Sequence, residues 1–344
     1  MEITRYIDFA PRFSGKDAEF ISRELYGMDV FVQPLPSERD QNFLLKDKKS
    51  GNKYVLKISN QKEKKEILEL QNSAMERIGL FLNTSSCPQI CLTARGKKTE
   101  KIRNKNRESH FVRLVTYIEG VPLAEVRPHS PGLLRSIGRF IAKIDQVLKE
   151  FSHPAAKRDF YWDLQKGPEV IKNFISYIND PDELDLINYF LNKFHSQASP
   201  IISELGKTII HNDGNDYNIL ISHPDKKGSN QKKAYGIIDF GDMVYSYTMG
   251  DIAVAASYVM MGKKNFWESA SYLIKGYNEI IKISDKELEA IHHFIYLRLC
   301  MSVALSAFQK KQYPDNEYLS ISEKKAWELL KRIREVKINP AHFV

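Results

Sequence analysis

Cysteine is scarce in this chain: only three of its 344 residues are cysteines. An odd, small number of cysteines in a chain of this length excludes a disulfide framework as the source of its stability. Glycine and proline are also sparse, with 17 and 14 residues, which excludes collagen-like repeats and a long disordered tract. A buried apolar core must therefore stabilise the chain, and its length predicts two domains.

Long apolar runs are missing as well. Residues 1–5 are followed by acids and aromatic residues instead of an apolar segment, so we expect no signal peptide. The most apolar stretch, residues 294–308, is interrupted by Arg298, and we expect it to be too short to span a membrane. These absences predict a cytoplasmic protein without a membrane partner.

The net charge of +8 at pH 7 suggests nucleic acid as a partner, but the location of the charge argues against it. Residues 95–107 and 223–233 account for all of the net positive charge. Both segments lack apolar periodicity and aromatic residues, so we expect solvated loops at hairpin tips and no platform on which bases could stack. The sequence therefore predicts no nucleic-acid partner.

The pattern of apolar residues changes near residue 120. Before it, strands are expected at residues 30–33, 42–46, 54–58 and 111–117. Two helices are expected there, at residues 14–26 and 61–78, with Ser14 and Asp17 at capping-box spacing in the first. Gly27 and Gly79 are expected to end these two helices.

Helical periodicity dominates the rest of the chain, apart from a β-rich segment at residues 208–240. Helices are expected at residues 133–151, 169–178, 181–198, 248–261, 266–281, 286–309 and 322–336. We therefore predict an α+β fold with two lobes. A small β-rich lobe spans residues 1–116, a hinge spans 117–120, and a large, mainly helical lobe spans 121–344.

The β-rich segment carries the densest group of polar side chains. His211 and Asp213 follow an apolar strand, Asn218 opens the next strand, and Asp239 closes a third. Carboxylate and amide oxygens are the ligands that Mg²⁺ accepts. Phosphoryl transfer needs one aspartate to orient the attacking hydroxyl, together with an asparagine and an aspartate that hold the metal. The combined pattern H-x-D-x-x-x-x-N and I-D-F-G-D therefore favours a catalytic site over simple turn-capping.

Lys57 lies at the end of an apolar strand and resembles the strand lysine that pairs with nucleotide phosphates in kinases. Helical phase places Glu63 and Gln71 on the inward stripe of the following helix and Glu69 away from it. The partner of Lys57 among Glu63, Glu69 and Gln71 stays open, and Gln71 would replace the usual ion pair.

No glycine lies between Gly27 and Gly51, so the chain has no G-x-G-x-x-G loop. Protein-kinase phosphate loops need glycine for close backbone approach, which excludes an ordinary protein kinase. Residues 37–42 offer hydroxyl, amide and main-chain donors that could cover phosphates instead, a plain β-turn being the alternative.

Several motifs, spread over nearly the whole chain, carry a resemblance to a known family. They are L-P-S at 35–37 with D-Q-N-F at 40–43, I-H-N-D at 210–213, N-D-Y-N-I-L at 215–220, D-F-G-D-M at 239–243, R-L-C at 298–300, and Y-P-x-N at 313–316 with Trp327. With these motifs the chain resembles the aminoglycoside phosphotransferase and choline kinase superfamily, which has a protein-kinase-like fold, and within it hydroxylysine kinase and its bacterial relatives. Many relatives carry glycine where this chain has Asn212.

The resemblance implies a role for each motif residue. Asp213 would be the catalytic base, Asn218 and Asp239 would bind Mg²⁺, and Lys57 would bind the phosphates of ATP or GTP. We also expect Ser37, Tyr117 and Ile118 to contact the nucleotide. His211 is expected to brace the loop by hydrogen bonds, because no nucleophile lies beside it at motif spacing. Asp251 is expected to anchor the loop backbone, an ordinary acid at a helix N-terminus being the alternative.

The acceptor pocket is implied less directly. Trp162 and Asp163 resemble a family segment that lines this pocket. Asp163 or Asp242 would pair with a substrate amine, and Arg158 or Arg298 with a carboxylate, intramolecular salt bridges being the alternative for each.

The sequence as a whole indicates a small-molecule kinase. Its reaction would be transfer of the nucleotide γ-phosphoryl group to a hydroxyl of an amino compound, with 5-hydroxy-L-lysine as the first choice of acceptor. Homoserine, another amino alcohol and an aminoglycoside are the alternatives. A nucleotide-binding pseudokinase is the rival of another class, and the intact Asp213, Asn218 and Asp239 argue against it.

Overall fold

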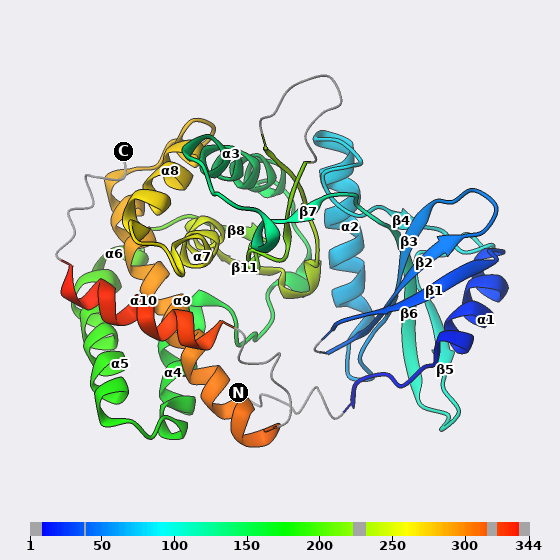
Figure 1. The fold of residues 1–344 in the computed structure, drawn as a ribbon, viewed down its shortest axis with the longest axis horizontal. Coiled ribbons are helices and arrows are strands. Elements are labelled where there is room, and N and C mark those ends of the chain that lie inside the picture. The colour runs from blue at the N-terminus through cyan, green and yellow to red at the C-terminus, as the bar shows by residue number, and fades with distance from the viewer. Residues whose placement is uncertain (1–8, 38, 223–231, 315–321, 337–344) are drawn as a thin grey trace. The chain divides into compact units, whose positions relative to one another are not determined.

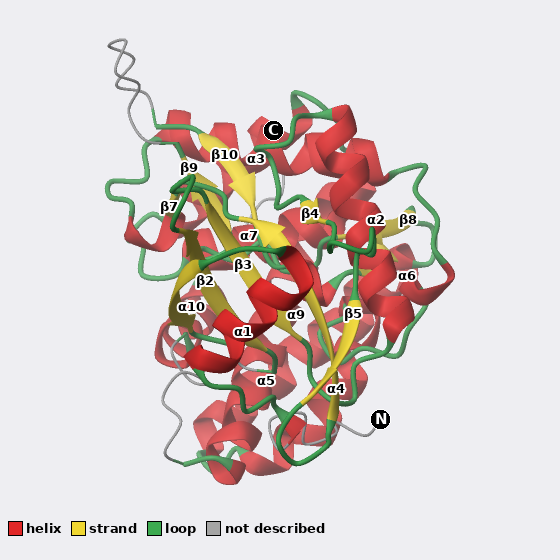
Figure 2. Cartoon of the chain, turned by 90° about the vertical axis from the view of Figure 1, so that its right-hand side faces the viewer, coloured by secondary structure: helices red, strands yellow, loops and turns green. Residues whose placement is uncertain are grey.

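The computed structural model describes residues 9–37, 39–222, 232–314 and 322–336. The chain divides into two compact units, Met1–Glu119 and Gly120–Val344. The first unit is built around an antiparallel sheet, and the second is mainly helical (Figures 1 and 2), so the predicted α+β fold is confirmed. The boundary falls within residues 117–120, and the hinge role of this segment stays a prediction.

The first unit has one sheet flanked by two helices. Its elements are α1 (Gly15–Tyr26), β1 (Val30–Leu35), β2 (Gln41–Asp47), β3 (Lys53–Ile58), α2 (Lys65–Phe81), β4 (Ile90–Cys91), β5 (Glu100–Arg103) and β6 (Ser109–Thr116). The strand order is β1-β2-β3-β6-β4, and β5 also pairs with β6. Strand β5 lies inside residues 95–107, where we expected only a loop; its alternating half-buried and exposed residues form an edge strand.

Helix α1 has the predicted ends. The Ser14 hydroxyl accepts a hydrogen bond from the Asp17 amide, the Asp17 side chain accepts one from the Ser14 amide, and Gly27 follows with a left-handed φ of 65°. Helix α2 differs from the prediction at both ends, beginning at Lys65 and continuing past Gly79 to Phe81. Gly79 is therefore not the end of the helix, and the end of the Gln89 side chain packs against it.

The second unit combines helices with short strands. Its elements are β7 (Val121–Pro122), α3 (Pro131–Leu148), α4 (Gly167–Phe174), α5 (Pro181–Lys193), α6 (Ser199–Ile202), β8 (Lys207–Ile210), β9 (Ile219–Ile221), β10 (Ala234–Ile237), β11 (Val244–Tyr247), α7 (Met249–Met260), α8 (Phe266–Asn278), α9 (Asp285–Gln312) and α10 (Glu323–Glu335). One small sheet has the order β10-β9-β7 and another pairs β11 with β8.

Helices α3 and α8 approach each other at backbone distance. A Cβ on Gly138 of α3 would overlap the Leu273 carbonyl oxygen of α8, and a Cβ on Gly276 of α8 would overlap the Arg135 carbonyl oxygen of α3. Each helix thus supplies a glycine where the other helix passes, and the pair forms one tightly packed body.

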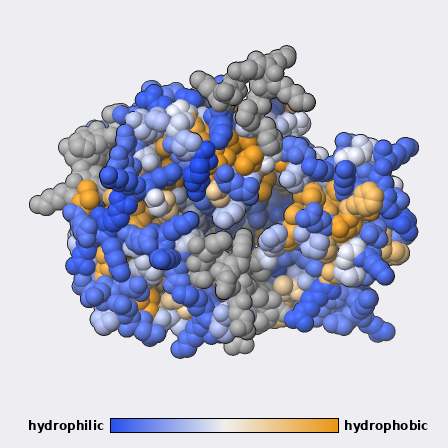
Figure 3. All heavy atoms as spheres, in the orientation of Figure 1, coloured by the Kyte–Doolittle hydropathy of each residue, from blue (hydrophilic) through white to orange (hydrophobic). Residues whose placement is uncertain are grey.

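Helix α9 contains the stretch that we expected to be too short for a membrane, and that expectation was wrong about its length. The helix has 28 residues and is apolar enough to cross a membrane by length and composition. Within its most apolar 18-residue window, however, 89% is buried inside the protein, which is typical of a core helix. On the face drawn in Figure 3, hydrophilic residues cover most of the surface and hydrophobic residues form separate areas.

Candidate active site

Four short strands bring the motif residues of the second unit together. Strand β8 ends directly before His211, β9 begins directly after Asn218, and β10 ends two residues before Asp239. The Ile238 amide donates to the Asn218 carbonyl oxygen over 3.0 Å, which sets Asp239 beside the start of β9. Strand β11, which sequence analysis missed, pairs Val244 with Ile210 and so returns the chain from Asp239 to the His211 loop.

Asp213 receives hydrogen bonds from two asparagine side chains. The Asn215 amide nitrogen lies 3.0 Å from Oδ1 and 3.1 Å from Oδ2 of Asp213. The Asn218 amide nitrogen donates to Oδ2 over 2.7 Å and to the Asp213 carbonyl oxygen over 3.0 Å. Burial raises the pKa of Asp213, the charge of Asp242 raises it further, and Arg298 opposes both. The side-chain amides of Asn215 and Asn218 thus fix the direction of the Asp213 carboxylate.

His211 is buried, and both of its ring nitrogens are used. Its Nδ1 accepts from the Asp213 amide over 3.3 Å, so the neutral ring carries its proton on Nε2, which donates to the Ile238 carbonyl oxygen over 3.2 Å. Burial lowers the pKa of His211 and keeps the ring neutral. Its ring also packs edge-on against Phe240 at 4.8 Å. These contacts are the ones that the loop-bracing role requires.

Asp251, in the first turn of α7, contacts the backbone of the same loop. Its Oδ2 accepts from the His211 amide over 2.9 Å and its Oδ1 from the Asn212 amide over 2.5 Å. Asn212 itself has a left-handed φ of 67°, a conformation that glycine and asparagine tolerate best. Asn212 is therefore one of the few side chains that this turn accepts.

Asn218 and Asp239 have the chemistry of a Mg²⁺ site. Asn218 turns its amide nitrogen to Asp213, and its amide oxygen is the ligand type that Mg²⁺ accepts. Asp239 is exposed, with a left-handed φ of 62°, and its Oδ1 accepts from the Gly241 amide over 3.3 Å. No group of three or more His, Cys, Asp or Glu in the described residues could hold a metal. Mg²⁺ does not need one, because it keeps waters and phosphates as ligands. The two residues therefore fit the ion.

Arg298 lies on core helix α9 and points to the catalytic loop. Its Nη2 is 3.5 Å from Oδ1 of Asp213, and its side chain is 3% exposed. The guanidinium carbon lies 4.1 Å from the centre of the Trp162 ring, and Nη1 donates to the Trp162 carbonyl oxygen over 3.4 Å. Arg298 therefore has an acidic partner inside the protein.

The other expected acceptor residues also have internal contacts. Asp163 is 4% exposed and accepts from the Ser246 hydroxyl over 2.5 Å and from the Gln165 amide over 2.9 Å. Arg158 donates to the Gly241 carbonyl oxygen over 2.7 Å. Asp242 is buried, and its charge acts on Asp213. Of the expected acceptor residues, Arg298 has the intramolecular ion pair that was the alternative, with Asp213, whereas these contacts of Asp163 and Arg158 are hydrogen bonds to neutral groups.

In the first unit, Lys57 is half-buried on β3 and lies opposite Arg113 of β6 in the sheet register. The buried Arg113 donates to Gln71 of α2 and, over 2.7 Å, to Oδ1 of Asn72. Glu69 pairs instead with Lys65 over 2.9 Å on the exposed side of α2. The inward phase of Gln71 and the outward phase of Glu69 are confirmed. The inward phase predicted for Glu63 was wrong, because α2 begins only at Lys65.

The remaining nucleotide candidates also lie in the first unit. Ser37 is exposed between β1 and β2. Tyr117 follows β6, its amide donates to the Lys53 carbonyl oxygen over 3.2 Å, and Ile118 is buried. The loop predicted at residues 223–233 lies outside the described residues up to position 231, and so does the motif residue at position 316.

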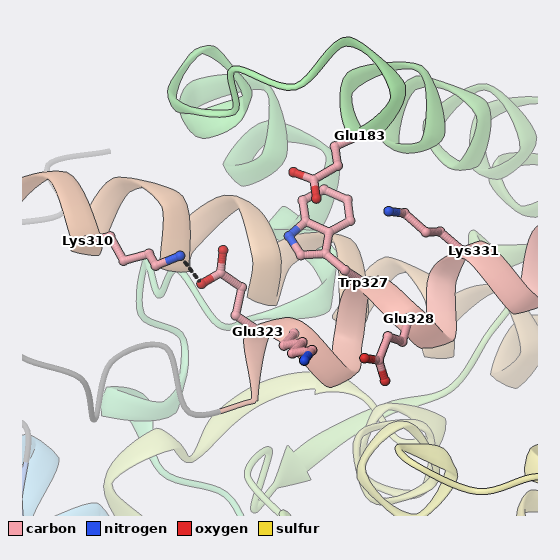
Figure 4. A pocket seen from close by; sticks show the side chains of 7 residues that line it. Glu183, Lys310, Glu323, Trp327, Glu328 and Lys331 are labelled. Atoms are coloured by element: carbon pink, nitrogen blue, oxygen red, sulfur yellow. Dashed lines mark ion pairs between the residues drawn. The ribbon is translucent and has the colours of Figure 1, made fainter.

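A hollow of about 660 Å³ lies in the second unit between α5, α9 and α10 (Figure 4). Trp327, Lys331 and Glu183 line it, and its edge carries an ion pair of 2.7 Å between Lys310 and Glu323. Its lining shares no residue with the catalytic loop. It is therefore a separate surface feature.

The roles of two further residues were not predicted from the sequence, one within the catalytic loop and one distant from it. Asn215 lies inside the quoted motif but was given no role, although it donates to both carboxylate oxygens of Asp213. Asp145 of α3 is fully buried beside Tyr277 of α8 and was not singled out. The sequence does carry a signal for Asp145, because this aspartate lies in the apolar stripe of a strongly amphipathic helix, where a charged residue is unusual.

Comparison with known proteins agrees with this architecture. Hydroxylysine kinase of Bos taurus is 30% identical over 344 residues, covering 94% of this chain and 90% of its own. The structure of amicoumacin kinase hAmiN in complex with AMP-PNP, Ca²⁺ and Ami has a TM-score of 0.70 at 16% identity, with 96% and 98% of the two chains covered. A microcompartment-associated aminopropanol kinase has a TM-score of 0.69 at 14% identity, with 94% and 98% covered.

The phosphotransferase enzyme family, known as APH, matches residues 32–271, which is well over half of the chain. The matched region contains β3 with Lys57, the whole catalytic loop and Asp239. Together with the fold of the solved kinases, this match places the chain: it belongs to the phosphotransferase enzyme family.

Proposed function

We propose that this protein is a small-molecule kinase that phosphorylates a hydroxyl group of an amino compound, with 5-hydroxy-L-lysine as its acceptor. One observation carries the proposal: the carboxylate of Asp213 lies in a loop that also holds Asn218 and sets Asp239 beside it. Phosphoryl transfer requires this combination of a hydroxyl-orienting aspartate and two oxygen ligands for a metal.

In the proposed reaction, Asp213 accepts a hydrogen bond from the acceptor hydroxyl and takes its proton as the phosphoryl group moves. Asn215 and Asn218 hold the carboxylate in one orientation, which is the positioning that such a transfer depends on. Asn218 and Asp239 would hold Mg²⁺, which neutralises phosphate charge when it is bound. Lys57 of β3 would contribute a further positive charge to the phosphates.

The phosphoryl donor is a purine nucleoside triphosphate in this proposal. The amicoumacin kinase structure holds AMP-PNP, which supports ATP. The resemblance to hydroxylysine kinase supports GTP, and we propose GTP as the preferred donor.

The acceptor is proposed from the relatives and from local charge. Hydroxylysine kinases about 30% identical over nearly the whole chain favour a hydroxylated diamino acid. The acidic charge of Asp242 acts on Asp213, so an ammonium group of the acceptor would be stabilised beside the reacting hydroxyl. Arg158 stays our candidate for the α-carboxylate, because a guanidinium can pair with a carboxylate through two parallel hydrogen bonds.

A coupled phosphotransfer assay tests the proposal. It compares kcat/KM for 5-hydroxy-L-lysine, lysine, homoserine, choline, aminopropanol and kanamycin, each with ATP and with GTP. We expect the highest value for 5-hydroxy-L-lysine with GTP, and binding without turnover for lysine, which has no hydroxyl. Higher turnover of homoserine, aminopropanol or kanamycin would contradict 5-hydroxy-L-lysine as the acceptor, while the proposed kinase activity would stand. No turnover with any acceptor, together with nucleotide binding, would favour a pseudokinase.

A further inference from the structure

Asp145 is an acid in the core of the second unit. It lies in the last turn of α3, its residue is 1% exposed, and the Tyr277 hydroxyl of α8 donates to its Oδ2 over 2.6 Å. Its other oxygen, Oδ1, is buried and has no N–H or O–H donor among the described residues. A buried carboxylate with a single hydrogen bond would be costly, so the charge state of this group needs an explanation.

A second carboxyl group lies beside it. Helix α3 packs against α7, and a hydrogen bond between the Asp145 and Asp251 side chains is one of the causes that raise the pKa of Asp145. Both oxygens of Asp251 already accept backbone amides of the catalytic loop, from His211 over 2.9 Å and from Asn212 over 2.5 Å. Two carboxylates cannot hydrogen-bond to each other, so the contact requires one proton between them.

The surroundings of the two groups decide which one holds that proton. Asp251 accepts two N–H groups and lies in the first turn of α7, and both features stabilise its negative charge. Asp145 lies in the last turn of α3, where the helix dipole disfavours a negative charge. Burial raises the pKa of Asp145 well above its ordinary value, and the charge of Asp251 raises it further.

We propose that Asp145 is a neutral carboxylic acid that donates a hydrogen bond to ionised Asp251, and that it is a positioning residue for the catalytic loop. A chain of contacts then runs from Tyr277 through Asp145 and Asp251 to the backbone of His211 and Asn212. Asp145 thus links the α3–α8 pair, which is packed at backbone distance, to the loop that carries Asp213.

Infrared difference spectroscopy of the full chain tests directly whether the carboxyl group of Asp145 is protonated. A protonated carboxyl group has a C=O stretching band that is separate from the bands of carboxylates. Burial raises the pKa of Asp213 as well, so near neutral pH both carboxyl groups contribute to this band. We expect the band to lose intensity in Asp145→Asn, to keep the Asp145 component in Asp213→Asn, and to be unchanged in the control Asp182→Asn, which alters an exposed acid of α5. A band of unchanged intensity in Asp145→Asn would overturn the proposal. This measurement does not depend on activity, so it stands if the proposed function fails.

Kinetics test the positioning role, which rests on the proposed function. An asparagine at position 145 still offers an N–H donor to Asp251, so Asp145→Asn should keep kcat within about 3-fold. Asp145→Leu has no donor, and we expect kcat to fall about 10-fold or more with the nucleotide KM nearly unchanged. Equal losses in the two variants would contradict the donor role. If Asp145→Leu does not fold, Asp145→Ala, which also has no donor, takes its place with the same expected loss of kcat.

Discussion

Arg298 of α9 and Asp213 of the catalytic loop form an ion pair of 3.5 Å. The guanidinium lies over the ring of Trp162, and Tyr258 of α7 also hydrogen-bonds to it. Its other contacts therefore hold the arginine in place while one edge faces the carboxylate. This geometry favours a role for Arg298 in orienting Asp213 over the expected role of binding a substrate carboxylate.

The change Arg298→Gln distinguishes these two roles. We expect kcat to fall about 10-fold or more, with the KM of a carboxylate-bearing acceptor changed less than about 3-fold, because the lost contact orients the base. Steady-state kinetics with 5-hydroxylysine and with an amino alcohol measure both constants. A rise in KM confined to the carboxylate-bearing acceptor, at unchanged kcat, would support the substrate role instead. Arg139→Gln, on the exposed side of α3, is the control.

Asp213→Asn should lower kcat by about 100-fold or more, because a positioned proton acceptor contributes on that order. The variant should also lose stability by about 1 kcal/mol. In native Asp213, both carboxylate oxygens accept hydrogen bonds, from Asn215 and, at Oδ2, also from Asn218. The amide nitrogen of the variant cannot accept a hydrogen bond, so at least one of these donors loses its partner. Single-turnover kinetics and urea unfolding measure the two effects. Near-native turnover would remove Asp213 from the mechanism.

Asp239→Asn should raise the Mg²⁺ concentration needed for half-maximal activity and nearly abolish turnover, because an amide replaces a charged ligand. Asparagine tolerates the left-handed φ of 62° at this position, so the turn should be kept. Nucleotide affinity in metal-free buffer should be little changed, and calorimetry with and without Mg²⁺ measures it. Activity of the native protein that is independent of any divalent metal would contradict the site.

Asn212→Gly should be less destabilising than Asn212→Ala by about 1 kcal/mol, because alanine is strained at a φ of 67°. Both variants lose the amide hydrogen bonds to the carbonyl oxygens of Trp162 and Asp242, each 3.3 Å long, so their difference isolates the backbone conformation. Equilibrium unfolding in urea gives the two free energies. Equal stability of the variants would show that the turn relaxes.

Gly138→Ala should destabilise the second unit by about 1–3 kcal/mol, because its Cβ would overlap the backbone of α8 at Leu273. Gly132→Ala is a matched control in the same helix: no atom lies within 4 Å of its Cβ, so we expect no loss of stability. Thermal unfolding of both variants gives the comparison. A Gly138 variant as stable as the control would mean that the two helices separate at little cost.

The sequence predicts best the features that short stretches determine. The caps of α1 depend on Ser14, Asp17 and Gly27, which lie within fourteen residues of one another, and all three behave as expected. Gly79 looks like a helix end for the same local reason, but α2 continues past it to Phe81, and the end of the Gln89 side chain packs against the glycine. Local propensity alone thus does not decide where a helix ends.

The same division applies to the candidate site. Asp213, Asn218 and Asp239 lie in a motif whose spacing alone suggests their grouping, and the structure brings them together. The contact of Arg298 with Asp213 crosses 85 positions of the chain, and that of Tyr277 with Asp145 crosses 132. No periodicity encodes such pairs, because they depend on how whole helices pack.

The link between α2 and the sheet has a consequence for how this contact responds to pH. In protein kinases, activity is switched by making or breaking an ion pair between a strand lysine and a helix glutamate. Here buried Arg113 donates to the neutral amide side chains of Gln71 and Asn72 of α2. None of these three side chains gains or loses a charge near neutral pH. We therefore expect this contact between α2 and the sheet to be kept where protonation of a glutamate would break an ion pair.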